Sequence, residues 1–286
     1  MITKLAKAKV NLTLDILGKR DDGYHEVSMI MQSIDLADIV TLEEADDIIV
    51  ETDIAELADD RTNIAYRAAE LLRDTHAPDR GAHIRIKKNI PLAAGLAGGS
   101  TDAGAVLLGL NELWGLGLTI DTLTDLGARL GSDVPFCMLG GTMLATGRGE
   151  VLKRVPALDV MPLVLVKPPV GVSTAAVYGG YRADRVSVHP TADSMTAAIE
   201  SKDKQRIFRA MGNVLETVTI ELHPEIADIK RSLLAAGAEH AMMSGSGPTV
   251  FAFAPTAEDA QRIAEHMKQK YSTYTVCTTA TCGGEE

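Results

Sequence analysis

Long hydrophobic runs are absent from this 286-residue chain. A membrane-spanning helix needs roughly 18 or more consecutive apolar residues, and no stretch of the sequence reaches that length. Lysines are scattered through residues 1–9 instead of preceding an apolar segment, which is unlike a secretory signal. We therefore expect a soluble protein that stays in the cytoplasm and has no membrane partner.

Aromatic residues and positive charge are also scarce. Only 4% of the residues are aromatic, and 39 acidic residues outnumber 28 basic ones, which gives a formal net charge of −11. A nucleic-acid surface needs a basic stripe, often with aromatic side chains interleaved. The composition therefore argues against a nucleic-acid partner, and any phosphate ligand must be held by local donors.

Cysteine is limited to Cys137, Cys277 and Cys282. The number is odd, and the last two have no histidine nearby, a pattern that fits neither a disulfide framework nor a zinc site. We expect reduced thiols and no dedicated protein metal site. The chain is 46% hydrophobic, and its length suits one large or two ordinary domains.

The most informative segment that is present is glycine-rich and spans residues 91–106. Alternating apolar and polar residues at 82–88 predict a half-buried strand, and Pro91 ends it. After the glycines, residues 100–102 are Ser-Thr-Asp, which are helix-capping types, and they open a helical pattern that runs to Trp114. Because the N–H groups at a helix N-terminus attract anions, this segment predicts a phosphate site.

A flexible connector before a well-capped helix is the alternative interpretation of this segment. Gly95, Gly98 and Gly99 make that interpretation less favourable, because each glycine loses backbone entropy on folding. The segment lacks the Gly-Lys-Ser/Thr ending of a Walker P-loop and the spacing of the dinucleotide fingerprint. A phosphate loop of another class is therefore favoured.

The rest of the chain predicts mixed strands and helices. In the first half, strands are expected at 2–17, 28–36, 39–44 and 48–52, with 28–36 and 39–44 paired through an Asp-Leu-Ala-Asp turn, and helices at 63–73 and 121–130. In the second half, strands are expected at 161–166 and 274–279, helices at 194–217, 224–236 and 257–270, and a hairpin at 241–244 and 249–254. The pattern breaks near Pro156, which predicts domains of residues 1–156 and 157–286.

Four segments together resemble the GHMP kinases, which include galactokinase, homoserine kinase and mevalonate kinase. They are residues 6–26, with Ala-Lys-Ala-Lys-Val-Asn-Leu and Asp-Gly-Tyr-His, the glycine-rich segment 91–106, residues 130–136, and residues 244–251, which begin Ser-Gly-Ser-Gly. The resemblance spans nearly the whole chain in the family's order. It implies a two-domain α+β fold, with an S5-like N-terminal domain, a ferredoxin-like C-terminal domain and the active site between them.

The activity that the resemblance implies is phosphoryl transfer from ATP, with Mg²⁺, to a hydroxyl group of a small molecule. The Asp-Gly-Tyr-His motif within residues 19–26 points to the member that phosphorylates the 2-hydroxyl of a cytidine diphosphate-linked methylerythritol in non-mevalonate isoprenoid precursor synthesis. Phosphoryl transfer leaves the protein mainly positioning and electrostatics, with a carboxylate to accept the hydroxyl proton.

Asp133 and Lys9 are the catalytic residues that the resemblance implies. Asp133 is the expected base, although by itself it also fits an aspartate that stabilises a turn. Lys9 lies in a β-like run, where a buried lysine needs a partner, and it would orient that carboxylate. Strand alternation puts Lys7 on the same face as Lys9, so periodicity does not decide which of the two lysines is buried.

The substrate end is implied to hold Asn11, Tyr24, His25 and Tyr178. Asn11 and His25 are expected near the cytosine or the reacting diol. Tyr24 is expected to stack on the cytosine, with Tyr178 on the opposite face, although a tyrosine before Gly-Gly also suits surface packing. Stacking does not distinguish bases, so hydrogen bonds near His25 would select cytosine.

The phosphate end is implied to comprise the glycine-rich loop and a second loop, Gly245, Ser246 and Gly247, which supports it; a tight hairpin turn fits the second loop as well. Ser100 or Thr101 would bind Mg²⁺. Ala97 stands where the family usually has glycine, and a positive φ there would cost on the order of 1 kcal/mol. The residues implied to bind ATP are Pro91, Leu92, Ala93, Ala94, Gly95, Leu96, Ala97, Gly98, Gly99, Ser100 and Thr101.

Other functions compatible with the pattern are a homoserine or mevalonate kinase and a nucleotide-binding regulatory protein without catalysis. The Asp-Gly-Tyr-His motif argues against the first, and the presence of both Lys9 and Asp133 argues against the second. An RNA-binding role, suggested only by the S5-like fold, is disfavoured by the acidity, since a fold does not carry a function. We expect a monomer or a weak homodimer.

Overall fold

The computed structural model describes residues 1–55, 57 and 61–282. The chain divides into two compact units. Unit 1 comprises Met1–Ala8, Leu36–Ile90 and Ala97–Gly140, and unit 2 comprises Lys9–Asp35, Pro91–Leu96 and Gly141–Glu286. The long strands β1 (Ile2–Lys19) and β2 (His25–Ala45) contribute residues to both units.

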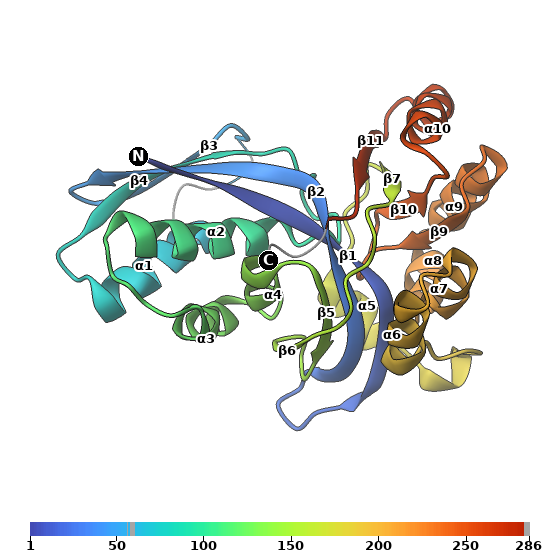
Figure 1. Ribbon diagram of the computed structural model, residues 1–286, viewed down its shortest axis with the longest axis horizontal. Coiled ribbons are helices and arrows are strands. Elements are labelled where there is room, and N and C mark those ends of the chain that lie inside the picture. Colours follow the sequence, from blue (N-terminus) through green and yellow to red (C-terminus); the bar gives the residue numbers. More distant parts are fainter. Residues whose placement is uncertain (56, 58–60, 283–286) are drawn as a thin grey trace. The chain divides into compact units, whose positions relative to one another are not determined.

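Unit 1 is a sheet covered by helices. Its strands lie in the order β3-β4-β2-β1, with β3 (Ile48–Thr52) parallel to β4 (Gly81–Lys87) and β4 antiparallel to β2. Helices α1 (Ile64–His76) and α2 (Gly98–Leu113) lie against one face of this sheet (Figure 1). A cluster of buried apolar side chains fills the space between the sheet and the helices; it includes Leu42, Leu72, Ile84 and Leu110.

Two further helices of unit 1, α3 (Ile120–Leu130) and α4 (Val134–Leu139), follow α2 along the chain. Helix α4 packs closely against α2, because a Cβ atom added at Gly104 of α2 would lie 2.9 Å from Cγ of Met138. This close approach fixes the turn that precedes α4, residues 131–133, relative to α2.

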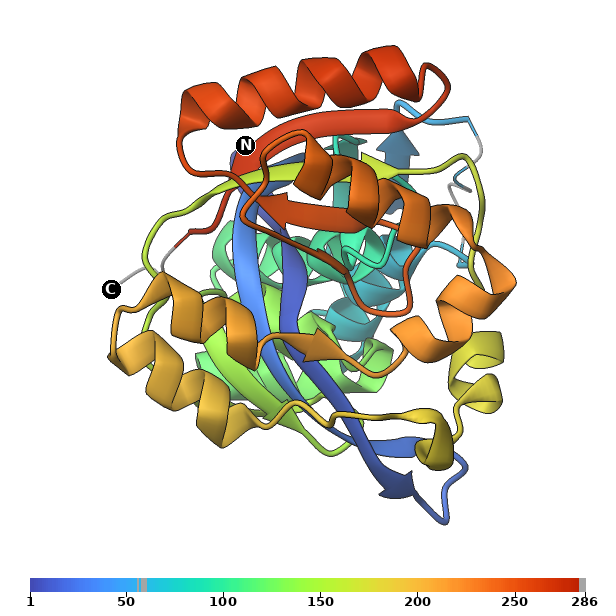
Figure 2. The same ribbon diagram turned by 90° about the vertical axis from the view of Figure 1, so that its right-hand side faces the viewer.

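Unit 2 contains a four-stranded antiparallel sheet in the order β11-β7-β10-β9. These strands are Thr275–Ala280, Pro162–Lys167, Val250–Phe253 and His240–Met243, respectively. Helices α9 (Glu225–Ala235) and α10 (Ala257–Lys270) lie on one face of that sheet (Figure 2).

The remaining elements of unit 2 are short. Strand β5 (Thr142–Thr146) pairs with β2 and with β6 (Val151–Arg154), and β8 (Gly212–Asn213) runs parallel to β1. The short helices are α5 (Thr174–Gly180), a 3-10 turn (Ala183–Arg185), α6 (Ala192–Glu200), α7 (Lys204–Ala210) and α8 (Glu216–Leu222).

Most predicted elements are confirmed, including the hairpin, which is formed by β9 and β10. The predicted helix at 194–217 is wrong, because α6 and α7 end before β8 and α8 starts after it. The predicted turn at 35–38 is also wrong, since β2 runs unbroken from residue 25 to residue 45. Asp38 is fully buried in the strand because its carboxylate accepts N–H groups from Asn89 and Ile90.

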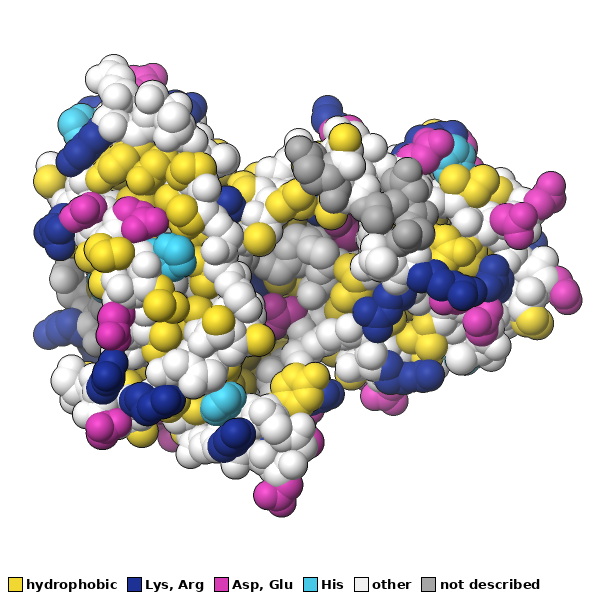
Figure 3. Space-filling model, turned by 180° about the vertical axis from the view of Figure 1, so that it is seen from behind, with side chains coloured by type: hydrophobic (Ala, Val, Ile, Leu, Met, Phe, Trp, Pro, Cys, Tyr) yellow, Lys and Arg dark blue, Asp and Glu magenta, His cyan; other side chains and the backbone are white. Residues whose placement is uncertain are grey.

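Charged side chains of both signs are interspersed over the face drawn in Figure 3. Within the described residues, no helix is both long and apolar enough to cross a membrane.

Candidate active site

The glycine-rich segment forms a sharply turning loop that leads into the N-terminus of α2. Ala93, Gly95 and Ala97 have φ angles of 48°, 73° and 61°, and the 16-residue helix α2 begins at Gly98. The first N–H groups of a helix have no partner inside it, and the helix dipole adds positive potential there. The loop and helix together offer a set of backbone donors suited to phosphate.

Residues 100–102 differ from the expected caps. They lie in the first turns of α2, while Ala97 occupies the N-cap position without a side-chain hydrogen bond. The left-handed φ of Ala97 meets the condition under which alanine was expected to be strained, by roughly 1 kcal/mol. Glycine tolerates this region freely, so position 97 accepts alanine at a small conformational cost.

The loop of residues 244–247 contacts the glycine-rich loop directly. Ser244 Oγ donates a hydrogen bond of 3.0 Å to the Gly95 carbonyl. A Cβ atom at Gly95 would lie 2.3 Å from the Ser244 carbonyl oxygen and 3.0 Å from that of Gly247. The two loops therefore pack backbone to backbone, and only glycine fits at position 95.

Asn213 is hydrogen-bonded to the loop of residues 244–247 and to the residue that precedes it. Its side-chain amide, in the two-residue strand β8, donates to the carbonyls of Met243 (2.9 Å) and Gly245 (2.7 Å). The side chain is buried, with the residue 7% exposed. Asn213 was not among the predicted site residues, because its position falls inside the predicted helix at 194–217.

Lys9 is the buried member of the lysine pair, with 4% of the residue exposed, whereas Lys7 is half-buried. The Lys9 ammonium donates to Asn11 Oδ1 at 2.9 Å and to the Gly95 carbonyl at 3.2 Å. A Cβ atom at Gly245 would lie 3.5 Å from Lys9 Nζ. The structure thus brings Lys9, Asn11 and both loops together. The positive charge of Lys9 contacts the glycine-rich loop at the Gly95 carbonyl.

At the predicted substrate end, the rings of His25 and Tyr178 lie 5.4 Å apart between centroids, with planes tilted by 41°. Tyr24 is 56% exposed, and the guanidinium of Arg148 lies 5.0 Å from the centre of its ring. Burial, and to a lesser degree the charge of Lys19, lowers the pKa of His25. The imidazole is therefore mainly neutral at pH 7, with one donor and one acceptor nitrogen.

Arg148 was not predicted as a site residue, because a single arginine in a loop carries no sequence signal.

Asn11 is buried, with 1% of the residue exposed. Its amide faces the sulfur of Met29 (Nδ2 to Sδ 3.3 Å) while its oxygen accepts from Lys9. Its orientation is therefore fixed from both ends.

Asp133 stands at the N-cap position of α4, but its side chain makes no capping hydrogen bond to that helix. The turn before it lies beside the start of α2, since a Cβ atom at Gly131 would be 3.8 Å from Ser100 Oγ. The helix-capping function that commonly explains an aspartate at such a position is thus not the one used here. Asp133 is half-buried and follows the turn that lies next to the predicted phosphate end.

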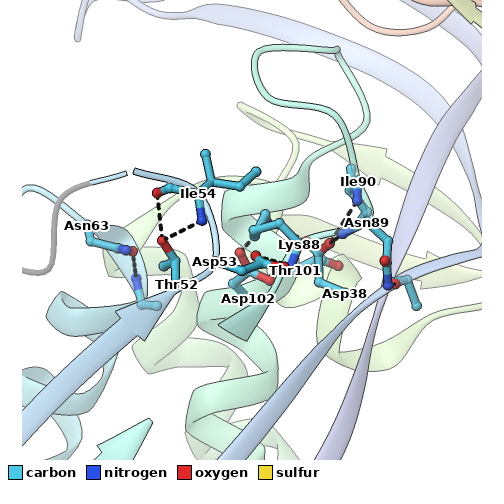
Figure 4. A network of polar contacts seen from close by, with 12 residues as sticks. Asp38, Thr52, Asp53, Ile54, Asn63, Lys88, Asn89, Ile90, Thr101 and Asp102 are labelled. Carbon is cyan, nitrogen blue, oxygen red and sulfur yellow. Dashed lines mark hydrogen bonds and ion pairs between the residues drawn. The ribbon is translucent and has the colours of Figure 1, made fainter. Parts of the chain in front are cut away.

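Three buried charged residues, Asp38, Lys88 and Asp102, lie together at the N-terminal part of α2 (Figure 4). The Lys88 ammonium pairs with Asp38 of β2 and with Asp102 of α2. The exposed fractions of the Lys88, Asp38 and Asp102 side chains are 2%, 0% and 6%. Asp102 was predicted as a helix cap and Asp38 as a turn residue, so this cluster was not among the predicted sites.

Burial raises the pKa of Asp102 to about 7; the charge of Asp38 adds to this rise, and Lys88 opposes it. Desolvation of a carboxylate favours its protonated form. Asp102 therefore changes its charge near neutral pH. It lies in the second turn of α2, one helical turn from the predicted phosphate site.

The described part of the chain holds no group of three or more His, Cys, Asp or Glu side chains arranged to bind a metal ion. Mg²⁺ usually takes one or two protein oxygens and completes its shell with water and phosphate. Thr101, 1% exposed, donates its hydroxyl to the Lys7 carbonyl. Ser100 is half-buried and is the better fit of the two.

Comparison with known proteins places the chain in a family. The profile for the GHMP kinases N terminal domain matches residues 63–141, and that for the GHMP kinases C terminal domain matches residues 195–273. Over 261 residues the chain is 52% identical to a 4-diphosphocytidyl-2-C-methyl-D-erythritol kinase of Geobacillus kaustophilus, covering 90% of each chain. Over 264 residues it is 50% identical to one of Brevibacillus brevis, covering 92% of this chain and 90% of that one.

Solved structures agree with this placement. A crystal structure of a 4-(cytidine 5'-diphospho)-2C-methyl-D-erythritol kinase matches with a TM-score of 0.85 and 32% identity, covering 99% of this chain and all of that one. A homoserine kinase from Cytophaga hutchinsonii matches with a TM-score of 0.75 and 21% identity, covering 98% and 96%, which shows the fold alone. The predicted two-domain α+β fold is confirmed, and the chain belongs to the GHMP kinases and, within them, to the 4-diphosphocytidyl-2-C-methyl-D-erythritol kinase family.

Proposed function

We propose that this kinase transfers the terminal phosphoryl group of ATP to the 2-hydroxyl of 4-diphosphocytidyl-2-C-methyl-D-erythritol, in non-mevalonate isoprenoid precursor synthesis. The observation that carries the proposal is the identity of about half of the residues, over nine-tenths of the chain, with relatives named for this substrate. The Asp-Gly-Tyr-His motif and the ring pair of His25 and Tyr178 supply matching substrate chemistry.

ATP lies with its phosphates against the glycine-rich loop and the N-terminus of α2. The N–H groups of Gly98, Gly99 and Ser100 face outward from the helix start and donate to phosphate oxygens. Ser100 would supply the protein oxygen for Mg²⁺, which would offset the negative charge of the ATP phosphates. The second loop, Gly245, Ser246 and Gly247, packs against the glycine-rich loop at Gly95. This packing keeps the backbone N–H donors of the glycine-rich loop in place.

In the chemical step, the 2-hydroxyl oxygen attacks the γ-phosphorus, the bond from that phosphorus to the ADP oxygen breaks, and the hydroxyl proton passes to Asp133. Lys9 supplies positive charge that favours the ionised forms of the base and of the attacking oxygen. The buried position of Lys9 supports this role, since its ammonium donates hydrogen bonds to the oxygens of Asn11 and Gly95.

At the substrate end of the site, Tyr24 and Tyr178 stack on the cytosine, and His25 forms hydrogen bonds with the edge of the cytosine ring. Stacking of a base on an aromatic ring contributes roughly 1–3 kcal/mol and does not distinguish the bases. The lowered pKa of His25 keeps the imidazole neutral, so that it donates one hydrogen bond and accepts another. Asn11 contributes to the polar contacts near the reacting diol.

Turnover with a panel of alcohols tests the substrate: ADP release is expected with the cytidylyl alcohol and not with homoserine or mevalonate. Turnover with homoserine or mevalonate instead would support a kinase activity and contradict the proposed substrate.

We also propose domains of residues 1–156 and 157–286, since the two profile matches fall on opposite sides of residue 156. Light scattering is expected to show a monomer or a weak homodimer.

A further inference from the structure

The buried cluster of Lys88, Asp38 and Asp102 has no part in the mechanism described above. Its three side chains are almost fully removed from solvent. Burying charges carries a desolvation penalty that an ion pair offsets only with good geometry and further hydrogen bonds. Apolar side chains of the same volume would often stabilise the fold as well, so stability alone does not account for these three charges.

The contacts of the cluster join the two ends of the glycine-rich loop. Asp38 Oδ1 accepts the backbone N–H groups of Asn89 (2.5 Å) and Ile90 (2.8 Å), where the chain leaves β4 and enters the loop. Lys88 Nζ donates to Asp102 Oδ2 at 2.5 Å, in the second turn of α2. The ammonium also lies directly beneath the helix start, because a Cβ atom at Gly98 would be 3.6 Å from Lys88 Nζ.

The charges of the cluster do not balance when both acids are ionised. One ammonium then faces two carboxylates, and Oδ1 of Asp102 is buried without a hydrogen-bond partner among the described residues. Negative charge close to the start of α2 opposes the binding of a polyanion there. The charged groups that act on Asp102 are Lys88 and Asp38, while α4 presents the apolar Met138 to α2.

We propose that Lys88 is a positioning residue of the nucleotide site: held between Asp38 and Asp102, its ammonium fixes the start of α2 against the loop entry and offsets the carboxylate charge beneath the phosphates. This inference rests on the proposed nucleotide site at the helix start. It does not depend on which alcohol is phosphorylated.

The test measures the dissociation constants of Mg-ADP and of the cytidylyl alcohol separately, by titration calorimetry on the full chain. The variants are Lys88→Met, Asp102→Asn and the double variant. Lys87→Met is the matched control, since Lys87 is the neighbouring lysine on β4 but is exposed. Binding of Mg-ADP is read without turnover, so a chain that binds it but does not phosphorylate the alcohol overturns the proposed substrate and leaves this inference supported.

Lys88→Met is expected to weaken Mg-ADP binding about tenfold or more, because the buried carboxylates near the helix start then lack their compensating charge, with less than a twofold change for the alcohol. Adding Asp102→Asn is expected to restore most of that loss, and Lys87→Met is expected to change neither constant. An equal loss for both ligands, or an unchanged affinity for Mg-ADP, would show a merely structural role and overturn the proposal.

If Lys88→Met does not fold, the single variant Asp102→Asn decides, because asparagine keeps the shape and leaves the Asp38–Lys88 pair intact. The affinity of the wild type for Mg-ADP, divided by that of Asp102→Asn, is expected to fall as the pH rises from 6 to 8, since the wild type gains a carboxylate beneath the phosphates. The ratio removes the titration of the nucleotide itself. A ratio independent of pH would contradict the proposal.

Discussion

Asp133 is the residue whose replacement best separates chemistry from binding. Asp133→Asn is expected to lower kcat by ~10²-fold or more, because the attacking hydroxyl loses its base, while Mg-ADP still binds. Steady-state kinetics and calorimetry measure the two quantities. Asp121→Asn, at an exposed aspartate in the first turn of α3, is the control. A near-normal kcat for the Asp133 variant would remove this residue from the mechanism.

Tyr24 tests the substrate end at the same scale. Tyr24→Ala is expected to raise KM for the cytidylyl alcohol about tenfold, in line with the loss of one stacking contact, and to leave KM for ATP nearly unchanged. Tyr24→Phe keeps the ring and is expected to behave like the wild type. Equal effects on both substrates would argue against stacking on cytosine.

Ala97 shows how far a single strained residue matters. With φ at 61°, Ala97→Gly relieves the left-handed strain and is expected to change the affinity for ATP by no more than ~1 kcal/mol, about fivefold. Calorimetry with wild type and variant measures the difference. A larger change would mean that the Ala97 methyl group itself contacts the nucleotide or displaces the loop.

Among the elements, the packing of the two loops depends on the absence of a side chain at Gly95. Gly95→Ala would place a Cβ atom 2.3 Å from the Ser244 carbonyl oxygen, at a positive φ of 73°, so the loops must separate. We expect a loss of about 1–3 kcal/mol in the free energy of unfolding and weaker ATP binding. Chemical denaturation measures the first quantity.

Gly18→Ala in β1 is the matched control, since nothing lies within 4 Å of a Cβ atom there and its φ is not positive. It is expected to leave both quantities near their wild-type values. If Gly95→Ala were as harmless as Gly18→Ala, the backbone contact between the loops would not matter for nucleotide binding.

Elements with a strong local signal could be predicted from the sequence. The glycine-rich turn into α2 and the β9–β10 hairpin follow from glycine, proline and alternation. The segment 194–217 could not, because its helical periodicity continues across Lys202, whose φ of 53° separates α6 from α7. Asp38 was assigned to a turn because local sequence cannot show its partners: its carboxylate accepts N–H groups 51 and 52 residues away along the chain.

Lys9 and Asp133 could be chosen only through the family resemblance. Periodicity does not decide between Lys7 and Lys9, and the local sequence around Asp133 favours an aspartate that stabilises a turn. Asn213 and Lys88 could not be chosen at all. Their partners, Gly245 and Asp102, are distant along the chain or were assigned another role. Residues that position a functional loop through distant contacts have no recognisable local sequence pattern, whereas the loop itself is recognisable from its glycines.

For the molecule as a whole, stability is expected to fall in mild acid because of His240. Burial lowers the pKa of His240 to about 4 from an ordinary 6.5, and its ring stacks on Phe208 at 5.5 Å. Well above pH 6.5 the imidazole is neutral in both the folded and the unfolded state; as the pH falls from 6.5 toward 4, the unfolded chain binds the proton first. The free energy of unfolding is therefore expected to drop by roughly 2–3 kcal/mol over that window.

Denaturant titrations at pH 7, 5.5 and 4.5 measure this drop. His240→Gln is expected to be less stable at pH 7 but to show a shallower fall, while His76→Gln, at an exposed histidine ending α1, keeps the wild-type slope. An unchanged slope in His240→Gln would assign the acid sensitivity to other groups.

The measurement that tests the central claim most directly is ADP release from Mg-ATP in a coupled assay, with 4-diphosphocytidyl-2-C-methyl-D-erythritol, homoserine, mevalonate or no acceptor. Rapid release is expected with the cytidylyl alcohol alone, and that release should be lost in Asp133→Asn. Release with homoserine or mevalonate instead, or none with any acceptor from a chain that still binds ATP, would contradict the claim.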